Sequence, residues 1–358
     1  MKLNKESRCF LSSAFILILS IPIAFYTPPE TYDLSRHYDT YNIYFSTHNT
    51  DLLDSYFGFS YLIQLLVLFE LPAQSMAFIC SLLFLFSIFK LNSFFSYGAA
   101  DDTVGKIFSL SYFISGIVPF FVFNYLALMS GLRFSIAVSF FILAVLADYR
   151  KNNKTSIIYH ILAVSFHFAL FGLVLLFYLS KKIHIKNVQV RISLFICGLI
   201  FSQFINVFSE YIMDAINLLQ LTDEWAYKAN LYLFGEWGSQ ANEALNSNGL
   251  VIVYASKAIT YFLFFVFLIY GSSINIAHNN DFVSLCAMLL SYFSAFYTLS
   301  GRFESVVICF LFLPIGMKLV KFKKLRHYEW FMLMLLFLRG CIQYVNIRDE
   351  YLRLLMFS

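Results

Sequence analysis

Long apolar segments alternate with short polar ones along almost the whole chain. An apolar run of about 20 residues can cross the hydrocarbon core of a bilayer as one helix. Runs of about that length lie at residues 9–26, 107–124, 131–147, 192–209, 250–270, 282–299, 303–320 and 328–345. Together with two interrupted stretches, 56–89 and 155–180, they predict an all-α polytopic integral membrane protein of roughly ten transmembrane segments.

The two interrupted stretches predict broken helices. In the first, "FELPAQS" places Glu70 and Pro72 inside an apolar run, and neither residue suits a helix that faces lipid. The second, residues 155–180, has basic residues on both sides. Because one spanning helix cannot begin and end on the same side of the membrane, we expect half-helices or a re-entrant hairpin there.

The basic residues predict the orientation of the chain, because cytoplasmic loops carry an excess of lysine and arginine. Four basic clusters are expected to face the cytoplasm, at residues 2–8, 150–154, 181–191 and 318–326. This orientation makes residues 27–55 a first periplasmic loop and residues 209–249 a large periplasmic loop of a single polytopic membrane domain, 1–358. Tyrosine, tryptophan and leucine in the larger loop suggest an amphipathic helix on the outer interface.

Composition and motifs exclude several functional classes. Hydrophobic residues make up 60% of the chain and charged residues 13%, with a mean hydropathy of +0.72, whereas soluble proteins carry about a quarter charged residues. The basic loops account for the net charge of +4, so we expect no nucleic-acid binding. No P-loop, dinucleotide fingerprint or G-x-S-x-G motif occurs, and no histidine pair has metal-ligand spacing with a third ligand nearby. We therefore expect no cofactor and no protein-held metal.

Three arginines fall at or near the predicted outer face: Arg36 in the first loop, Arg133 in "LMSGLRFSIAVSFF" and Arg302 in "TLSGRFESVVICF". An arginine beside an apolar helix is costly unless it has a partner, faces a polar cavity or snorkels to the headgroups. Snorkelling is one interpretation. The other is a phosphate site, because guanidinium groups bind phosphate oxygens bidentately, which makes pyrophosphate the natural ligand.

His167 and Asp39 are the other candidate site residues. His167 lies near the centre of the second interrupted stretch, seven residues after His160 and therefore on about the same helical face. It is either a hydrogen-bonded packing residue or a donor to a phosphate or hydroxyl. Asp39, in the tyrosine-rich first loop, is either a solvated acid paired with Arg36 or a base for a sugar hydroxyl.

Four segments, in this order, resemble the EpsG-like branch of the Wzy-type polysaccharide polymerases. They are "SRHYDTYNIYF", "LMSGLRFSIAVSFFILAVLADYRKNNK", "LAVSFHFALFGLVLLF" and "GRFESVVICFLFLPIG". The resemblance implies an O-antigen or exopolysaccharide polymerase in the bacterial inner membrane. Such an enzyme transfers a growing glycan from undecaprenyl pyrophosphate to the terminal sugar of a lipid-linked repeat unit on the periplasmic face.

The resemblance also suggests roles for the candidate residues. Arg133 and Arg302 would bind the pyrophosphate, Asp39 would act as base or orient the acceptor, Arg36 would contact Asp39, sugar or phosphate, and His167 would donate to a phosphate or hydroxyl. Expected partners are the undecaprenyl-pyrophosphate-linked oligosaccharide, membrane lipids, and a chain-length regulator and flippase of the same pathway. A flippase or other transporter, an O-antigen ligase and a structural partner in an assembly complex are the alternatives.

Overall fold

The computed structural model describes residues 5–26, 28, 33–50, 53, 56–97, 122, 131–204, 211, 214, 227, 247–271, 278–320 and 325–346. Every regular secondary-structure element in these ranges is a helix, which confirms the all-α class. The described residues fall into two compact units. The first unit contains the described residues within Met1–Leu175 and Gly316–Lys324. The second unit contains the described residues within Leu176–Ile315 and Leu325–Asn346.

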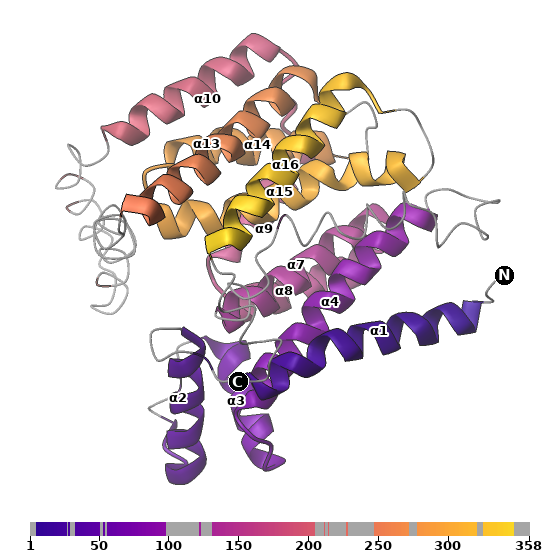
Figure 1. The fold of residues 1–358 in the computed structure, drawn as a ribbon, viewed down its shortest axis with the longest axis vertical. Helices are drawn as coiled ribbons and strands as arrows, with labels where there is room; N and C mark the ends of the chain where they lie inside the picture. Colours follow the sequence, from indigo (N-terminus) through magenta and orange to yellow (C-terminus); the bar gives the residue numbers. More distant parts are fainter. Residues whose placement is uncertain are drawn as a thin grey trace. The chain divides into compact units, whose positions relative to one another are not determined.

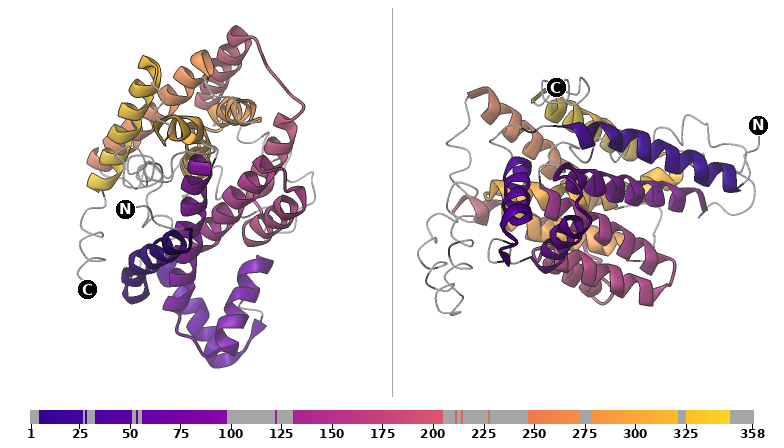
Figure 2. Two further views of the ribbon diagram at one scale, coloured as in Figure 1. Left: turned by 90° about the vertical axis from the view of Figure 1, so that its right-hand side faces the viewer. Right: turned by 90° about the horizontal axis from the view of Figure 1, so that it is seen from below.

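The first unit is centred on α7. Its helices are α1 (Lys5–Phe25), α2 (Asp33–Thr47), α3 (Phe57–Leu68), α4 (Gln74–Tyr97), α7 (Leu132–Tyr149), α8 (Asn153–Phe166) and the beginning of α9 (Leu170–Ser180). Helix α7 packs along α4 on one side and along α8 on the other (Figure 1). Helix α1 runs beside α4, as the right-hand view of Figure 2 also shows. Almost every side chain of the first four turns of α7 is buried, so this helix forms the core of the unit.

The second unit contains the end of α9, then α10 (Val188–Gln203), α13 (Ser247–Tyr270), α14 (Asn279–Tyr292), most of α15 (Tyr297–Val320) and α16 (His327–Asn346). Helix α10 packs along α14, and α13 packs along α16 (Figure 1). Gly198 on α10 is adjacent to Ser291 and Tyr292 of α14, which leaves no space for a larger residue. A glycine at this crossing therefore allows the two helices to approach closely.

Three of the described helices contain stretches long and apolar enough to cross a membrane: Gln74–Leu91, Leu132–Tyr149 and Gly249–Tyr270. Shorter apolar helices lie at Ile16–Phe25, Phe57–Leu68, Leu170–Ser180 and Val188–Gln203. The chain is thus a helical membrane protein. The total of roughly ten segments, the periplasmic loops and the single domain stay predictions, and residues 107–124 and most of 209–249 lie outside the described residues.

Both predicted helix breaks are present. Helix α3 ends at Leu68 and α4 begins at Gln74, and Glu70 between them has a positive φ of 52°. Helix α8 ends at Phe166 and α9 begins at Leu170. Backbone groups at the ends of these helices form turn hydrogen bonds, which reduces the cost of interrupting the helical pattern.

One boundary prediction was wrong. The run 282–299 is not one helix, because α14 stops at Tyr292 and α15 begins at Tyr297. A turn of backbone hydrogen bonds from Phe293, Ser294 and Phe296 ends α14 there. The first predicted loop also contains a 15-residue helix, α2. This helix forms because Leu34, Tyr38, Tyr41 and Tyr44 recur at helical spacing and are buried together.

Candidate functional site

In the first unit, residues from four separate segments meet around an arginine. Tyr56 directly precedes α3, Arg133 is the second residue of α7, and His167 lies between α8 and α9. His37 on α2 is close enough to Arg133 to interact with it electrostatically. We call His37, Tyr56, Arg133, Phe134 and His167 the arginine cluster.

Aromatic contacts hold the arginine cluster together. The Cζ atom of Arg133 lies 4.7 Å from the centroid of the Tyr56 ring, within the range of a cation–π interaction. The Tyr56 and His167 rings are 5.2 Å apart between centroids, and Phe134 meets His167 edge-on at 5.4 Å. Arg133 is only partly buried whereas His167 is buried, so the arginine is the more accessible of these two residues.

His37 brings a neutral imidazole to the same region. Its ring packs edge-on against Phe59, with the centroids 5.0 Å apart. Burial, followed by the positive charges of Arg133 and Arg36, lowers the pKa of His37 from 6.5 to about 3. At neutral pH this imidazole is therefore uncharged, and it can donate one hydrogen bond and accept another.

The helix break determines where His167 lies. Its backbone is extended, with φ −154° and ψ 105°, and its N–H donates to the carbonyl of Ala163 at 3.1 Å. The expectation that His160 and His167 share a helical face was wrong, because α8 ends one residue before His167. His160 instead packs inside the helical layer, 5.7 Å from the ring of Phe141.

Close packing between α3 and α8 supports this arrangement. A Cβ atom added at Gly58 would lie 2.8 Å from both Ser165 Oγ and a ring carbon of Phe166. Gly58 follows Tyr56 by two residues, and Phe166 directly precedes His167. The absence of a side chain at Gly58 thus lets the segments that carry Tyr56 and His167 come together.

The remaining candidates on α2 have different surroundings. Arg36 forms an ion pair with Asp33, one helical turn away. Asp39 lies on the exposed face of α2, and it forms no ion pair with any residue in the described part of the chain. The Tyr41 hydroxyl donates to the carbonyl of Leu71 in the α3–α4 break. The structure therefore brings Arg133, His167 and His37 together but does not place Asp39 among them.

Arg302 belongs to the second unit. It is the sixth residue of α15 and is partly exposed. Two residues further along the same helix, the buried Glu304 accepts a hydrogen bond from Tyr261 at 2.8 Å. Lys257 on α13 donates to the carbonyl of Ser294 at 2.9 Å. Arg302 thus lies on the same helix as the buried Glu304 side chain.

Arg339 on α16 completes a buried polar network in the second unit. Its Nε atom donates to Thr260 Oγ1 at 2.9 Å, and its terminal nitrogens donate to Gln343 and Ser305, each at 3.3 Å. Glu304 is near enough to attract both Arg339 and Lys257 electrostatically. Ionisable side chains inside apolar helices are usually functional or pair with one another. The Glu304 network is the name we give to the following residues: Lys257, Thr260, Tyr261, Glu304, Ser305, Arg339 and Gln343.

Sequence reasoning missed several of these residues. His37 was noticed only as part of a polar stretch, and Tyr56 gave no signal because aromatic residues make up 20% of the chain. A clearer signal existed for the Glu304 network, because Lys257, Glu304 and Arg339 each interrupt an apolar run. Such residues can be found by searching apolar segments for isolated charges.

The fold and these clusters define a class: a helical membrane protein with arginines and histidines placed at helix ends and breaks. A family model described as the EpsG family matches residues 10–355, so the chain belongs to the EpsG family. No curated protein and no solved structure matches the chain. Membership of this family, which covers nearly the whole chain, indicates a function of the polysaccharide-polymerase type in a membrane.

Proposed function

We propose that the protein is a polysaccharide polymerase that uses a lipid-pyrophosphate-linked glycan as donor. The growing glycan passes from undecaprenyl pyrophosphate to the terminal sugar of a lipid-linked repeat unit on the periplasmic face of the inner membrane. The observation that carries this proposal is the stacking of Arg133 on Tyr56 beside His167. This contact lies within a chain that the EpsG family model matches over residues 10–355.

Arg133 has the chemistry that the leaving group requires. As the glycosyl bond breaks, negative charge develops on the pyrophosphate oxygens, and a fixed cation stabilises that charge. The cation–π contact with Tyr56 restricts the Arg133 side chain before the substrate arrives, so less side-chain entropy is lost on binding. His167, packed against the same Tyr56 ring, would donate a hydrogen bond to a phosphate or hydroxyl oxygen.

The transfer step needs a base on the acceptor side. The acceptor hydroxyl oxygen bonds to the anomeric carbon of the donor glycan, and the bond from that carbon to the pyrophosphate oxygen breaks. The lipid pyrophosphate leaves with the electron pair, and the hydroxyl proton passes to the base. Asp39 is the proposed base or acceptor-orienting group, because its exposed carboxylate is accessible to a second substrate. Arg36, paired with Asp33, would contact a sugar or phosphate.

Arg302 is the second proposed pyrophosphate ligand. Its neighbour Glu304 is anchored by Tyr261, so this segment of α15 is held in place by buried hydrogen bonds. A chain-length regulator and a flippase of the same pathway are the proposed protein partners.

The test is the surface polysaccharide of a strain that lacks the gene, complemented with wild type or Arg302→Ala at equal membrane levels. We expect the wild type to restore a ladder of long chains on a silver-stained gel. Arg302→Ala should give the core plus a single repeat unit. Loss of even that single unit would indicate a flippase or ligase, and an unchanged ladder would remove Arg302 from the site.

A further inference from the structure

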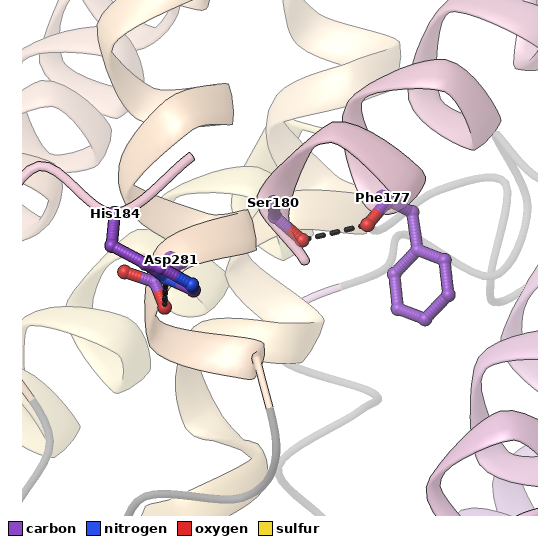
Figure 3. A network of polar contacts seen from close by, with 4 residues as sticks. All are labelled: Phe177, Ser180, His184 and Asp281. Carbon is purple, nitrogen blue, oxygen red and sulfur yellow. Dashed lines mark hydrogen bonds and ion pairs between the residues drawn. The ribbon is translucent and has the colours of Figure 1, made fainter. Parts of the chain in front are cut away.

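Three metal-ligand side chains meet in the second unit at a place that the proposed glycan transfer does not use. His184 lies in the segment between α9 and α10, His278 directly precedes α14, and Asp281 is in the first turn of α14. The Nδ1 atom of His184 is 2.8 Å from Asp281 Oδ2 (Figure 3). The rings of His184 and His278 stack with their centroids 5.8 Å apart.

One potential ligand atom from each of these residues lies within 4.8 Å of the other two. Two imidazole nitrogens and one carboxylate oxygen form a donor set that zinc and similar transition-metal ions prefer. In a tetrahedral zinc site with bonds of about 2.0–2.2 Å, neighbouring ligand atoms are roughly 3.3 Å apart. Small side-chain rotations would therefore widen the contact between His184 and Asp281 and draw His278 closer.

The side chains are accessible to an ion from solution. The side chains of His184 and Asp281 are 41% and 30% exposed. The segment directly before His184 is held to the end of α9, because the backbone N–H groups of Lys182 and Ile183 each donate to the carbonyl of Leu179 at 2.9 Å. Within α9, the Ser180 hydroxyl donates to the carbonyl of Phe177 at 2.7 Å (Figure 3). An ion would thus meet a partly fixed set of ligands at an open surface.

The surrounding charges do not exclude a cation. Lys182 and Lys186, each two residues from His184, are exposed to solvent, which screens their charges. Lys181 has its ammonium over the rings of Phe177 and Tyr178 at 4.9 Å and 4.7 Å. Arg191 attracts Asp281 electrostatically and is the cation with which a metal ion would compete. The Asp281 carboxylate supplies the negative charge that a divalent ion requires at this site.

We propose that His184, His278 and Asp281 bind one divalent transition-metal ion, with zinc the best match to the donor set. The basic residues around His184 predict that this site faces the cytoplasm. Three protein ligands leave a fourth position for water or an exogenous ligand. A bound ion would link the segment before α10 to the beginning of α14.

Direct metal binding tests this proposal. The full-length protein is purified in detergent with an affinity tag that contains no histidine, stripped with a chelator and equilibrated with zinc or cobalt. Mass spectrometry of the eluted metal gives the stoichiometry, and visible absorption of cobalt reports its coordination. We expect one zinc ion per chain, and about tenfold or greater weakening in His184→Gln, His278→Gln and Asp281→Asn.

His327→Gln is the matched control, because this exposed histidine at the beginning of α16 lies outside the three-residue site. It should bind zinc as the wild type does. Zinc should also raise the unfolding temperature of the wild type and the control but not that of His278→Gln, since an ion that binds only the folded chain stabilises it. Absence of a zinc equivalent in the wild type, or equal binding by His278→Gln, would overturn the proposal.

Discussion

The guanidinium of Arg133 lies over the ring of Tyr56, with 4.7 Å between Cζ and the ring centroid, although the two residues are 77 positions apart in the sequence. This contact joins the beginning of α7 to the segment that enters α3. The Tyr56 ring also packs near His167, at the break between α8 and α9, with 5.2 Å between the ring centroids. One aromatic ring thus connects a cation and an imidazole from separate helices.

Lysine at position 133 would keep the charge but lose the planar fork and its stacking on Tyr56. Hydrogen bonds to charged groups contribute about 1.5–3 kcal/mol, so we expect Arg133→Lys to reduce long-chain polymer about tenfold or more. The measurement is the silver-stained ladder at matched membrane levels. Arg150→Lys is the control, because Arg150 is also over an aromatic ring, Phe94 at 5.6 Å, but at the other end of α7. A full ladder from Arg133→Lys would argue against bidentate phosphate binding.

The pKa of His37 predicts a stability change in acid. In the unfolded chain this histidine takes up a proton as the pH falls through 6.5, whereas in the folded chain its pKa is about 3. The stability that this group contributes is therefore fully present above pH 6.5 and is lost progressively as the pH falls toward 3. His37→Gln should flatten the fall in unfolding temperature within that window, measured in detergent. An equal fall in His37→Gln and wild type would show that other groups cause it.

Arg133 is the second cause of the low pKa of His37, after burial. Arg133→Ala should therefore raise the pKa of His37, and the acid-dependent loss of stability should occupy a narrower pH range. His327→Gln, an exposed histidine in the other unit, should leave the pH profile unchanged. A wider range in Arg133→Ala would contradict the electrostatic interaction between these two side chains.

Much of the helical layout was predictable from the lengths of the apolar runs and from the polar and basic residues that interrupt or flank them. Glu70 and Pro72 correctly marked one helix break, and the basic residues on both sides of 155–180 marked the other, because both arguments rest on the cost of polar groups in lipid. The boundary between α14 and α15 was missed, since the run 282–299 contains no charged residue, proline or glycine, and backbone hydrogen bonds of a turn end the helix.

The candidate site was predictable only in part. Arg133 and His167 could be selected because each is a polar residue in an apolar segment. Their connection through Tyr56 could not, because it depends on which helices are neighbours. The cluster of His184, His278 and Asp281 also depends on which helices are neighbours, because the two histidines are 94 positions apart in the sequence. Spacing along the chain identifies a metal site only when the ligands are close to one another in the sequence.

The hydrogen bond from Tyr261 to Glu304 should stabilise the second unit. Tyr261→Phe removes the donor at 2.8 Å and leaves the buried carboxylate with one partner fewer, at a cost of about 1–3 kcal/mol. Tyr328→Phe is the matched control, because the buried Tyr328 hydroxyl has no hydrogen-bond partner among the residues that the structure describes. In detergent, Tyr261→Phe should lower the unfolding temperature, whereas Tyr328→Phe should leave it unchanged. Equal unfolding temperatures would mean that the Tyr261 hydroxyl contributes nothing.

Gly198 allows α10 and α14 to pack closely, and a methyl group there should force them apart. The added Cβ would clash with Ser291 Oγ and would lie 2.7 Å from a ring carbon of Tyr292. The serine hydroxyl can rotate away, but the tyrosine ring is part of the helix contact. Overpacking of this kind costs about 1–3 kcal/mol, so Gly198→Ala should lower the unfolding temperature.

Gly172→Ala separates this packing effect from the general effect of replacing a helical glycine. No atom lies within 4 Å of a Cβ built at Gly172, so alanine there should be neutral or stabilise by about 0.4–1 kcal/mol, because it restricts the unfolded chain. Adding Ser291→Ala to Gly198→Ala removes the nearest clash and should recover part of the loss. If Gly198→Ala and Gly172→Ala have the same unfolding temperature, α10 and α14 do not require this close approach.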